Sequence, residues 1–263
     1  MATPCTSLLI ATYNWPDALE LVFKSISSQT KQVDEILIAD DGSDYRTKLV
    51  IESFKKTTNI PVKHFWHEDR GFRKTIIMNE ALASALGDYI IQIDGDIILD
   101  PFFVEDHLSE SKKGFYIKGS RAMLSEIRTK SILKGKNIKI SPFSEGVGSK
   151  INATRAPFLS FLFRGDQLRS NNLRGCNFAF WKEDFIRVNG YNNDLEGWGH
   201  EDIELAARLT NLGIKQRQLK TKAVCFHLYH KLNARNNEDI NYKKYLNVVE
   251  SGITNCKNGI RQI

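Results

Sequence analysis

The stretch Tyr89-Ile90-Ile91-Gln92-Ile93-Asp94-Gly95-Asp96 decides how the rest of the chain is interpreted, because it is an apolar strand that ends in two carboxylates. Residues i and i+2 of an extended chain point to the same face, so Asp94 and Asp96 can aim at one point beyond the strand. Two hard oxygen donors there suit Mg²⁺ or Mn²⁺, and a diphosphate can share the ion. Asp-Gly-Asp is also a good turn, and this segment alone leaves both interpretations open.

The composition is that of an ordinary soluble protein. The chain has 263 residues, of which 41% are hydrophobic and 26% charged, and it can hold one large α/β domain or two small ones. No apolar run approaches the length of about 20 residues that crosses a bilayer, and the N-terminus lacks the features of a signal peptide. The four cysteines show no Cys-x-x-Cys spacing. We therefore expect a cytoplasmic protein with reduced cysteines.

The positive charge is concentrated in a basic segment, residues 112–174, which carries 14 Lys and Arg against 3 Asp and Glu. The whole chain has a net charge of +6, so the rest of it is acidic. A segment of this kind is usually a solvated surface. It can also meet something acidic, namely phosphates, anionic lipid headgroups or an acidic saccharide.

Apolar runs and helical spacing predict strands that alternate with helices. The predicted strands cover residues 7–11, 35–39, 62–66, 89–93, 176–181 and 223–227. The predicted helices start at Pro16, run from Arg73 to Leu86 with Gly87 closing the end, and run from Glu201 to Leu212 with Gly213 as the cap. This alternation predicts an α/β fold with a doubly wound, mostly parallel sheet. We expect residues 125–170 to form an irregular loop or lid, and the tail after Asn233 to be a surface helix or extension.

Three polar clusters follow three of the predicted strands. They are Thr12-Tyr13-Asn14, Asp40-Asp41 and Asp94-Gly95-Asp96. Ligands of doubly wound sheets gather outside the carboxyl ends of the strands, so one shared pocket is a better interpretation than three chance turns. The chain has no Gly-x-Gly-x-x-Gly after its first strand and no Gly-Lys-Ser/Thr loop, which argues against a dinucleotide fold or a P-loop.

Five motifs, taken in order, carry a family resemblance. They are Ala11-Thr12-Tyr13-Asn14, Ala39-Asp40-Asp41-Gly42-Ser43, Asp69-Arg70-Gly71-Phe72-Arg73-Lys74, Asp94-Gly95-Asp96 and Glu196-Gly197-Trp198-Gly199-His200-Glu201-Asp202. The first four resemble the nucleotide-sugar half of an inverting, family 2-like glycosyltransferase with the GT-A fold, which has a Rossmann-like sheet. The fifth is similar to the acceptor-side motif of β-1,4-galactosyltransferases and bacterial chondroitin polymerases, except at His200, where a glycine is usual.

The resemblance implies a single GT-A domain over residues 1–263. Its parts would be a nucleotide-sugar half (1–120), a basic irregular insertion or lid (121–170), an acceptor-binding and catalytic half (171–232) and a tail (233–263). The implied donor-side residues are Thr12, Tyr13, Asn14 and Asp41 for the uracil and ribose pocket, Arg73 and Lys74 for the nucleotide or its diphosphate, and Asp94 for the ribose or a metal-bound water. In this pocket Asp41 would accept a hydrogen bond from the uracil ring N–H.

A metal site is also implied, with Asp96 and His227 as ligands of Mn²⁺ (or Mg²⁺). His230 competes with His227 for this role. At positions i and i+3 of an extended chain the two rings would face opposite sides, so we expect at most one of them, His227, to be a ligand. The remaining histidines that we expect at the surface are His64, His67 and His107.

On the acceptor side the resemblance implies Asp202 as the catalytic base, with Trp198 and Glu201 contacting the substrate. Acids that open a helix are also favourable against its dipole, which is the simpler explanation for Glu201 and Asp202 on their own. Trp198 lies between two glycines, and such a loop is costly to order. That arrangement favours an indole presented to a sugar face.

These residue types fit an inverting transfer, which needs a base on the acceptor hydroxyl and a cation at the leaving diphosphate. We predict a hexosyltransferase that moves a hexose or N-acetylhexosamine from a UDP-sugar to a saccharide or lipid-linked saccharide acceptor, in capsule or lipopolysaccharide synthesis. It would work in the cytoplasm, in peripheral contact with the anionic inner face of the cell membrane, and no nucleic-acid partner is expected. Two alternatives stay open: a sugar-phosphate nucleotidyltransferase, and a non-catalytic protein that binds anionic saccharide or nucleic acid.

Overall fold

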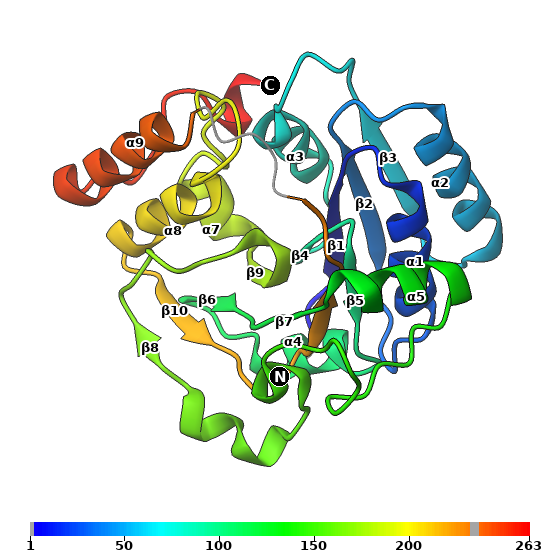
Figure 1. Ribbon diagram of the computed structural model, residues 1–263. Coiled ribbons are helices and arrows are strands. Elements are labelled where there is room, and N and C mark those ends of the chain that lie inside the picture. Colours follow the sequence, from blue (N-terminus) through cyan, green and yellow to red (C-terminus); the bar gives the residue numbers. More distant parts are fainter. Residues whose placement is uncertain (1–2, 232–236) are drawn as a thin grey trace.

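An eight-stranded sheet runs through the computed structural model, which describes residues 3–231 and 237–263 (Figure 1). The strand order is β3-β2-β1-β4-β9-β6-β10-β8. The strands are β1 (Thr6–Thr12), β2 (Glu35–Asp40), β3 (Val62–Trp66), β4 (Tyr89–Asp94), β6 (Phe115–Lys118), β8 (Asp166–Gln167), β9 (Phe178–Trp181) and β10 (Lys215–Gln218). The start of the predicted tail, residues 233–236, lies outside the described residues.

Parallel pairing dominates one side of this sheet. β3, β2, β1 and β4 are all parallel to one another. β9 then runs antiparallel between β4 and β6, β10 is parallel to β6, and β8 is an antiparallel edge strand. The predicted α/β fold with a mostly parallel sheet is confirmed.

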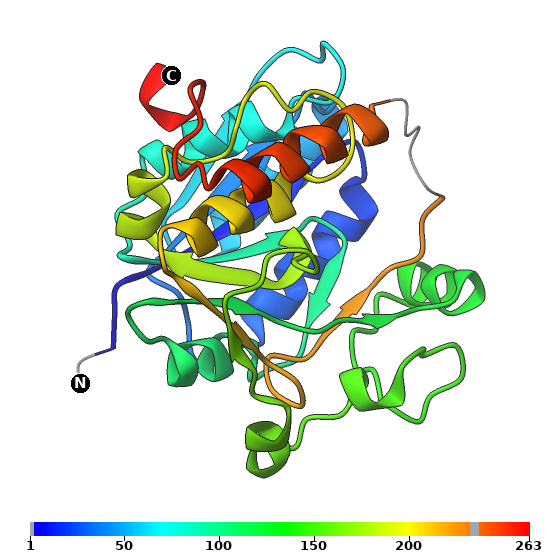
Figure 2. The ribbon, with the colours of Figure 1, turned by 90° about the vertical axis from the view of Figure 1, so that its left-hand side faces the viewer.

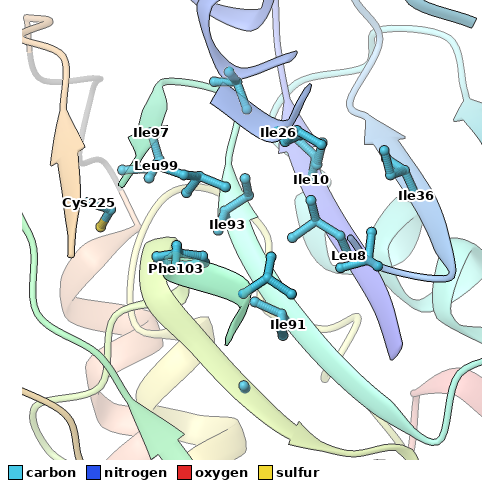
Figure 3. Packing of buried hydrophobic residues seen from close by; sticks show 14 of the residues in the cluster. Leu8, Ile10, Ile26, Ile36, Ile91, Ile93, Ile97, Leu99, Phe103 and Cys225 are labelled. Carbon is cyan, nitrogen blue, oxygen red and sulfur yellow. The ribbon is translucent and has the colours of Figure 1, made fainter. Parts of the chain in front are cut away.

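Helices cover both faces of the sheet, because alternate residues of each strand enter opposite cores. Leu8 and Ile10 of β1 pack beneath α1 (Pro16–Ser27), α2 (Tyr45–Thr57) and α4 (Phe103–Glu110), in the cluster that Figure 3 shows from close by. Leu9 enters the core beneath α3 (Lys74–Ala83), α7 (Lys182–Arg187) and α8 (Glu201–Asn211). Burial on both faces explains why β1, β2 and β4 are nearly continuous apolar runs, whereas the edge strand β3 is half-buried and carries Lys63 and His64.

A second sheet brings a late part of the chain to the end of β4. Its order is β5-β11-β7, formed by β5 (Ile97–Leu99), β11 (Cys225–His227) and β7 (Ala122–Met123). β5 begins directly after Asp96, and its Ile97 is paired with His227. The Leu228 N–H also donates to the Asp96 carbonyl at 3.1 Å. The chain from 225 to 230 is thereby held beside the two carboxylates.

Several helices differ from the sequence-based expectation. The helix α2 was not anticipated, and it starts after Asp44, whose side chain accepts the Arg46 N–H. Residues 125–170 are not wholly irregular, because α5 (Glu126–Gly135) begins there with Ser125 as its N-cap. That region continues with α6 (Lys150–Ala153) and the 3₁₀ helix η1 (Pro157–Phe163), and η2 (Gly175–Asn177) follows. In the tail, α9 (Glu238–Ser251) packs on α8 and η3 (Ile260–Gln262) is the last helix of the chain as described.

Over residues 3–231 and 237–263 no helix has both the length and the apolar character that crossing a bilayer requires.

The expected end of α3 at Gly87 is wrong, because the helix ends at Ala83. Gly87 instead lies against β1, where its N–H donates to Ser7 Oγ at 3.0 Å. A Cβ at Gly87 would lie 2.5 Å from the Ser7 backbone nitrogen. The glycine is therefore required by close approach to a strand and not by a helix cap. Two predicted strands also start late, at Phe178 and Cys225.

Candidate active site

The polar clusters predicted at three strand ends lie at one edge of the sheet. Thr12 is in register with Asp40, and Ala11 with Asp94, in parallel pairs. The Asp41 N–H donates to the Thr12 carbonyl at 3.0 Å, and the Gly95 N–H to the Ala11 carbonyl at 2.7 Å. The side chains that follow β1, β2 and β4 therefore border one region, as the sequence predicted.

The loop after β1 is held by side-chain hydrogen bonds. Tyr13 is half exposed, and its hydroxyl donates to Asp69 Oδ2 at 2.8 Å. The Asn14 N–H donates to Ser43 Oγ at 2.8 Å, with Asn14 in the left-handed region at φ 47°. The loop after β3 and the loop after β1 are thus joined through Tyr13. Thr12 itself is buried at the end of β1.

Asp41 is buried and already holds two partners. Its Oδ1 lies 2.7 Å from His67 Nε2, and its two oxygens accept the Arg73 N–H at 3.0 and 3.2 Å. Burial raises the pKa of the carboxyl, although His67 and the Arg73 N–H oppose the shift. A carboxylate has about four lone-pair sites, so it can accept one further N–H.

The expectation that three histidines lie at the surface is wrong. His67 contacts Asp41, His64 Nε2 lies 3.0 Å from Asp40 Oδ2, and His107 is fully buried. His67 directly follows β3, as Asp41 follows β2. The rule that polar residues at strand ends face the ligand would have identified His67 from the sequence.

Asp96, His227 and His230 form a cluster in which one potential ligand atom of each lies within 4.8 Å of the others. Asp96 Oδ2 is 3.6 Å from His227 Nε2 and 3.4 Å from His230 Nε2. Each histidine places Nδ1 against a backbone carbonyl, that of Leu228 at 2.9 Å and that of Lys231 at 2.8 Å. Donation from Nδ1 leaves the Nε2 lone pair free, which is the tautomer that binds metals.

The rings of His227 and His230 were expected to face opposite sides of an extended chain, so that only one could be a metal ligand. The structure shows that this geometry is wrong. β11 ends at His227, so the chain from there to His230 is not an extended strand. The Leu228 N–H bonds to Asp96, and the Tyr229 N–H donates to Thr129 Oγ1 at 2.9 Å. These two bonds turn the backbone, and the ring centres of His227 and His230 come to lie 5.2 Å apart.

Lys74 connects the carboxylates at the end of β4 with those at the start of α8. Its Nζ lies 2.9 Å from Asp94 Oδ1 and 3.9 Å from Glu201 Oε1. Burial alone would lower the pKa of Lys74, but Asp94, Asp202 and Glu201 raise it well above its ordinary value. Burial would likewise raise the pKa of Asp94, and Lys74 reverses this so that the pKa is lowered. The neighbouring Arg73 donates from Nη2 to the Glu68 carbonyl at 2.6 Å.

The side chain of Asp202 is held in place by the backbone N–H of Gly175. Its Oδ2 accepts the Gly175 N–H at 2.7 Å, and its Oδ1 is 3.5 Å from the Tyr191 hydroxyl, which donates to Gln92 at 2.8 Å. A Cβ at Gly175 would lie 2.5 Å from Asp202 Oδ1, so a larger residue here would push the carboxylate out of this position. Burial raises the pKa of Asp202, and burial together with Asp202 raises that of Glu201 to about 7.

Gly175, Tyr191 and Gln92 were not anticipated as site residues. Gln92 carried a usable signal, because it is a polar side chain inside an apolar strand. Arg121 was likewise not predicted as a site residue from the sequence. Its Nη1 lies 3.0 Å from Cys176 Sγ, and its charge helps to lower the pKa of Asp94.

The loop before α8 adopts a run of left-handed conformations. Gly197, Gly199 and His200 have φ values of 77°, 110° and 72°. His200 therefore occupies a backbone conformation that favours glycine, the residue usual there in the resembling galactosyltransferases. Its ring centre is 5.1 Å from that of Tyr242 on α9. Trp198 lies partly exposed in this loop.

Comparison with family models and with known proteins agrees with this arrangement. The model described as glycosyl transferase family 2 matches residues 7–165, and the one described as the N-terminal domain of galactosyltransferase matches residues 159–231. The chondroitin synthase of Escherichia coli is 25% identical over 239 residues, which are 84% of this chain and 34% of that protein. The chain thus spans about a third of the length of this relative.

Solved structures show the same fold. GalNAc-T7 with UDP, GalNAc and Mn²⁺ superposes with a TM-score of 0.67 at 17% identity, over 94% of this chain and 48% of that one. S. aureus TarS in complex with UDP gives 0.64 at 14% identity, over 97% and 67%. With the family model matching more than half of its length and its sheet matching these transferases, the chain belongs to glycosyl transferase family 2 and has the GT-A fold.

Proposed function

We propose that this chain is a metal-dependent inverting glycosyltransferase that moves a hexose or N-acetylhexosamine from a UDP-sugar to a saccharide or lipid-linked saccharide acceptor. The observation that carries the proposal is the position of Lys74 between two carboxylate groups of different character. On one side lies Asp94, two residues before the Asp96 cluster, and on the other the Glu201–Asp202 pair. Support comes from the relatives, one of which is named a chondroitin synthase, and from the UDP-bound neighbours.

Asp202 would act as the base. An acceptor hydroxyl attacks the anomeric carbon on the face opposite the leaving UDP, so the configuration inverts and the hydroxyl proton passes to Asp202. The raised pKa makes Asp202 a stronger base than an ordinary aspartate. The Gly175 N–H fixes Oδ2, and Oδ1, which has only the long 3.5 Å contact with the Tyr191 hydroxyl, would accept the proton. Trp198 would present its indole to a sugar ring, with Glu201 beside it.

Asp96, His227 and His230 would hold the divalent cation. Asp96 Oδ1 is buried and accepts no hydrogen bond from the described residues, which fits a carboxylate prepared for a metal. Two imidazoles with one carboxylate suit Mn²⁺ better than Mg²⁺, which prefers oxygen ligands only. The ion would neutralise the charge that develops on the leaving diphosphate.

The nucleotide would bind beside the ends of β1 and β2. Asp41 keeps acceptor capacity for the uracil N–H, and Thr12, Tyr13 and Asn14 would line the pocket. Arg73 carries a buried Nε without a hydrogen-bond partner among the described residues, as expected of a group that awaits an anion. In this scheme Lys74 positions Asp94 against the ribose or a metal-bound water.

The proposal extends to the setting of the reaction. The acceptor would be a growing bacterial surface polysaccharide, capsule or lipopolysaccharide, on the cytoplasmic side of the cell membrane. The basic segment 112–174 would meet the anionic membrane surface.

Calorimetric titration with UDP, with and without Mn²⁺, tests the donor site. The native chain, Asp96→Asn and the exposed control Asp239→Asn on α9 are compared. We expect UDP binding that needs Mn²⁺, that is lost in Asp96→Asn and that is retained in Asp239→Asn. Absence of UDP binding in both conditions would overturn the proposal. A panel of UDP-sugars, followed by UDP release, then identifies the donor.

A further inference from the structure

The helix η1 exposes its apolar side chains to an unusual extent. Phe158, Phe161 and Leu162 are 75%, 67% and 62% exposed, and no residue of η1 is buried. Figures 1 and 2 both place η1 at the lower edge of the molecule, and Figure 1 shows it next to β8. Soluble proteins rarely gather large apolar side chains in one exposed segment unless something covers them.

Both ends of η1 are pinned to the body of the protein. Before it, Arg155 donates from Nε and Nη2 to the two Asp106 oxygens on α4, at 2.8 and 2.7 Å. After it, Arg164 pairs with Glu110, also on α4. The Ala156 N–H donates to the Thr221 carbonyl at 2.9 Å. The exposure of η1 is therefore imposed by the fold and is not a loose loop caught in one position.

A basic cluster lies beside η1. It consists of Lys118, Arg169, Arg174 and Lys220. Lys220 Nζ lies 5.3 Å from the centre of the Phe163 ring, which joins the cluster to η1. Burial and then the charges of the other three lower the pKa of Lys118. Nearby Arg155, Arg164 and Arg217 are paired with carboxylates, whereas no carboxylate of residues 3–231 or 237–263 is ion-paired with the cluster.

We infer that η1 docks onto an anionic lipid bilayer, with Phe158, Phe161 and Leu162 in the interfacial region and the basic cluster against the headgroups. Aromatic and leucine side chains beside cations are the composition of segments that lie in a membrane interface. Charge complementarity favours the bilayer over a second copy of this chain, because two copies of a protein of net charge +6 repel. The inference rests on the proposed membrane contact and is independent of the transfer reaction.

Docking in this way has a consequence for the acceptor. Arg174 of the basic cluster directly precedes Gly175, whose N–H holds Asp202. The cluster therefore extends from η1 to the backbone that fixes the catalytic base. An acceptor carried on a lipid phosphate would have its anionic group near these cations and its sugar near Asp202.

Flotation of the full chain with lipid vesicles tests the inference. The vesicles contain phosphatidylcholine alone or an equal mixture with phosphatidylglycerol. The test variant combines Phe158→Ser, Phe161→Ser and Leu162→Ser, and the matched control combines Leu49→Ser, Leu86→Ser and Ile240→Ser, at exposed apolar positions outside the basic segment 112–174. We expect the native chain and the control to float with the anionic vesicles only, and the test variant to bind at least about tenfold more weakly.

Three outcomes would overturn the inference, and they are distinguishable. If the test variant floats like the native chain while Arg169→Ser with Lys220→Ser does not, the membrane contact stands and η1 has no part in it. If the native chain binds neither vesicle, the membrane contact itself falls. If sedimentation shows a native dimer that the test variant loses, a second copy covers η1. UDP release measured without vesicles reports on the transfer reaction separately.

Discussion

The two carboxylate pairs of the site have the same chemistry and opposite surroundings. Asp94 and Asp96, at the end of β4, face Lys74 at 2.9 Å and two imidazoles at 3.4 and 3.6 Å. At the start of α8, Glu201 is buried and Asp202 is half-buried, with Lys74 no closer than 3.9 Å to Glu201 Oε1. The cation lowers the pKa of Asp94, whereas burial raises the pKa values of Glu201 and Asp202. Burial raises the pKa of Asp96 as well, so the contact with Lys74 is what sets Asp94 apart from the other three carboxylates. Surroundings, and not residue type, therefore separate a carboxylate that pairs with a cation from carboxylates suited to take a proton.

The largest effect should follow from Asp202→Asn. The amide keeps the shape and loses the base, so we expect transfer to fall by about 10²–10⁴-fold while UDP affinity is unchanged. Rates of UDP release from the accepted UDP-sugar and calorimetry with UDP measure the two quantities. The exposed Asp239→Asn is the control. A rate within a few-fold of the native rate would show that the acceptor-side pair is not the proton-accepting one.

The metal cluster can be tested by His227→Ala and His230→Ala, made singly. Because both Nε2 atoms face Asp96, we expect each change to weaken Mn²⁺ binding by about tenfold or more. Titration with Mn²⁺ in the presence of UDP measures this, with Tyr229→Ala as the control for disturbance of the segment. If only one variant loses affinity, the cluster supplies a single imidazole ligand.

Glu201→Gln tests the surroundings of the second carboxylate pair through the free energy of unfolding. The folded-state pKa of about 7 lies above the ordinary 4.5, so the folded protein holds this proton more tightly than the unfolded chain does. The stabilisation is complete below pH 4.5 and is lost as the pH rises through 7. The glutamine variant, which cannot ionise, should therefore gain about 1–3 kcal/mol relative to the native chain between pH 5 and pH 8. Denaturant unfolding at both pH values tests this, with the exposed Glu250→Gln as the control, and a pH-independent difference would contradict it.

Asp41→Asn should weaken UDP binding by about tenfold, because an amide presents only one acceptor oxygen to the Arg73 N–H, His67 and the uracil. Calorimetry with UDP measures the change. Asp88→Asn, an exposed position before β4, is the control. Equal affinities in the native chain and Asp41→Asn would remove Asp41 from the nucleotide pocket.

The smallest effect is expected at His200. His200→Gly relieves a φ of 72° and loses the contact with Tyr242, so the free energy of unfolding should change by less than about 1 kcal/mol. His200→Val places a β-branched side chain at the same positive φ and should lower the free energy of unfolding by about 1–3 kcal/mol. Thermal unfolding of the two variants gives the comparison, and equal midpoints would contradict the strained backbone.

Sequence patterns predicted the half-buried edge strand β3, and they predicted β1, β2 and β4 well because these three strands are buried on both faces and therefore stand out as apolar runs. They failed for α2, which buries only Thr47, Ile51 and Phe54, and for α5, which buries Thr129 and Ile132. Helices that cover a core with so few apolar residues leave little periodicity in the sequence.

The site was predictable where it follows strand ends and unpredictable where it depends on loops. Asp41 is the first residue after β2 and Asp96 the second after β4, so their placement follows from the topology of the parallel strands. The turn after β11 that brings His230 to Asp96 depends on hydrogen bonds from distant residues, such as that to Thr129. Gly175 approaches Asp202 across 27 positions of sequence, and no local pattern encodes that contact.

The position of β4 between β1 and β9 has a mechanical consequence. Its hydrogen bonds join β1, beside the proposed nucleotide pocket, on one edge and β9, beside the proposed acceptor side, on the other. A hinge that opened the two sides like a clamshell would have to break the ladder from Tyr89 to Gln92, together with the bond from Gln92 to the Gly175 carbonyl at 3.2 Å. The distance between the Asp96 cluster and Asp202, the proposed metal site and base, is thus set when the chain folds, and in this proposal substrate entry and product release come from movement of the loops around a stiff frame.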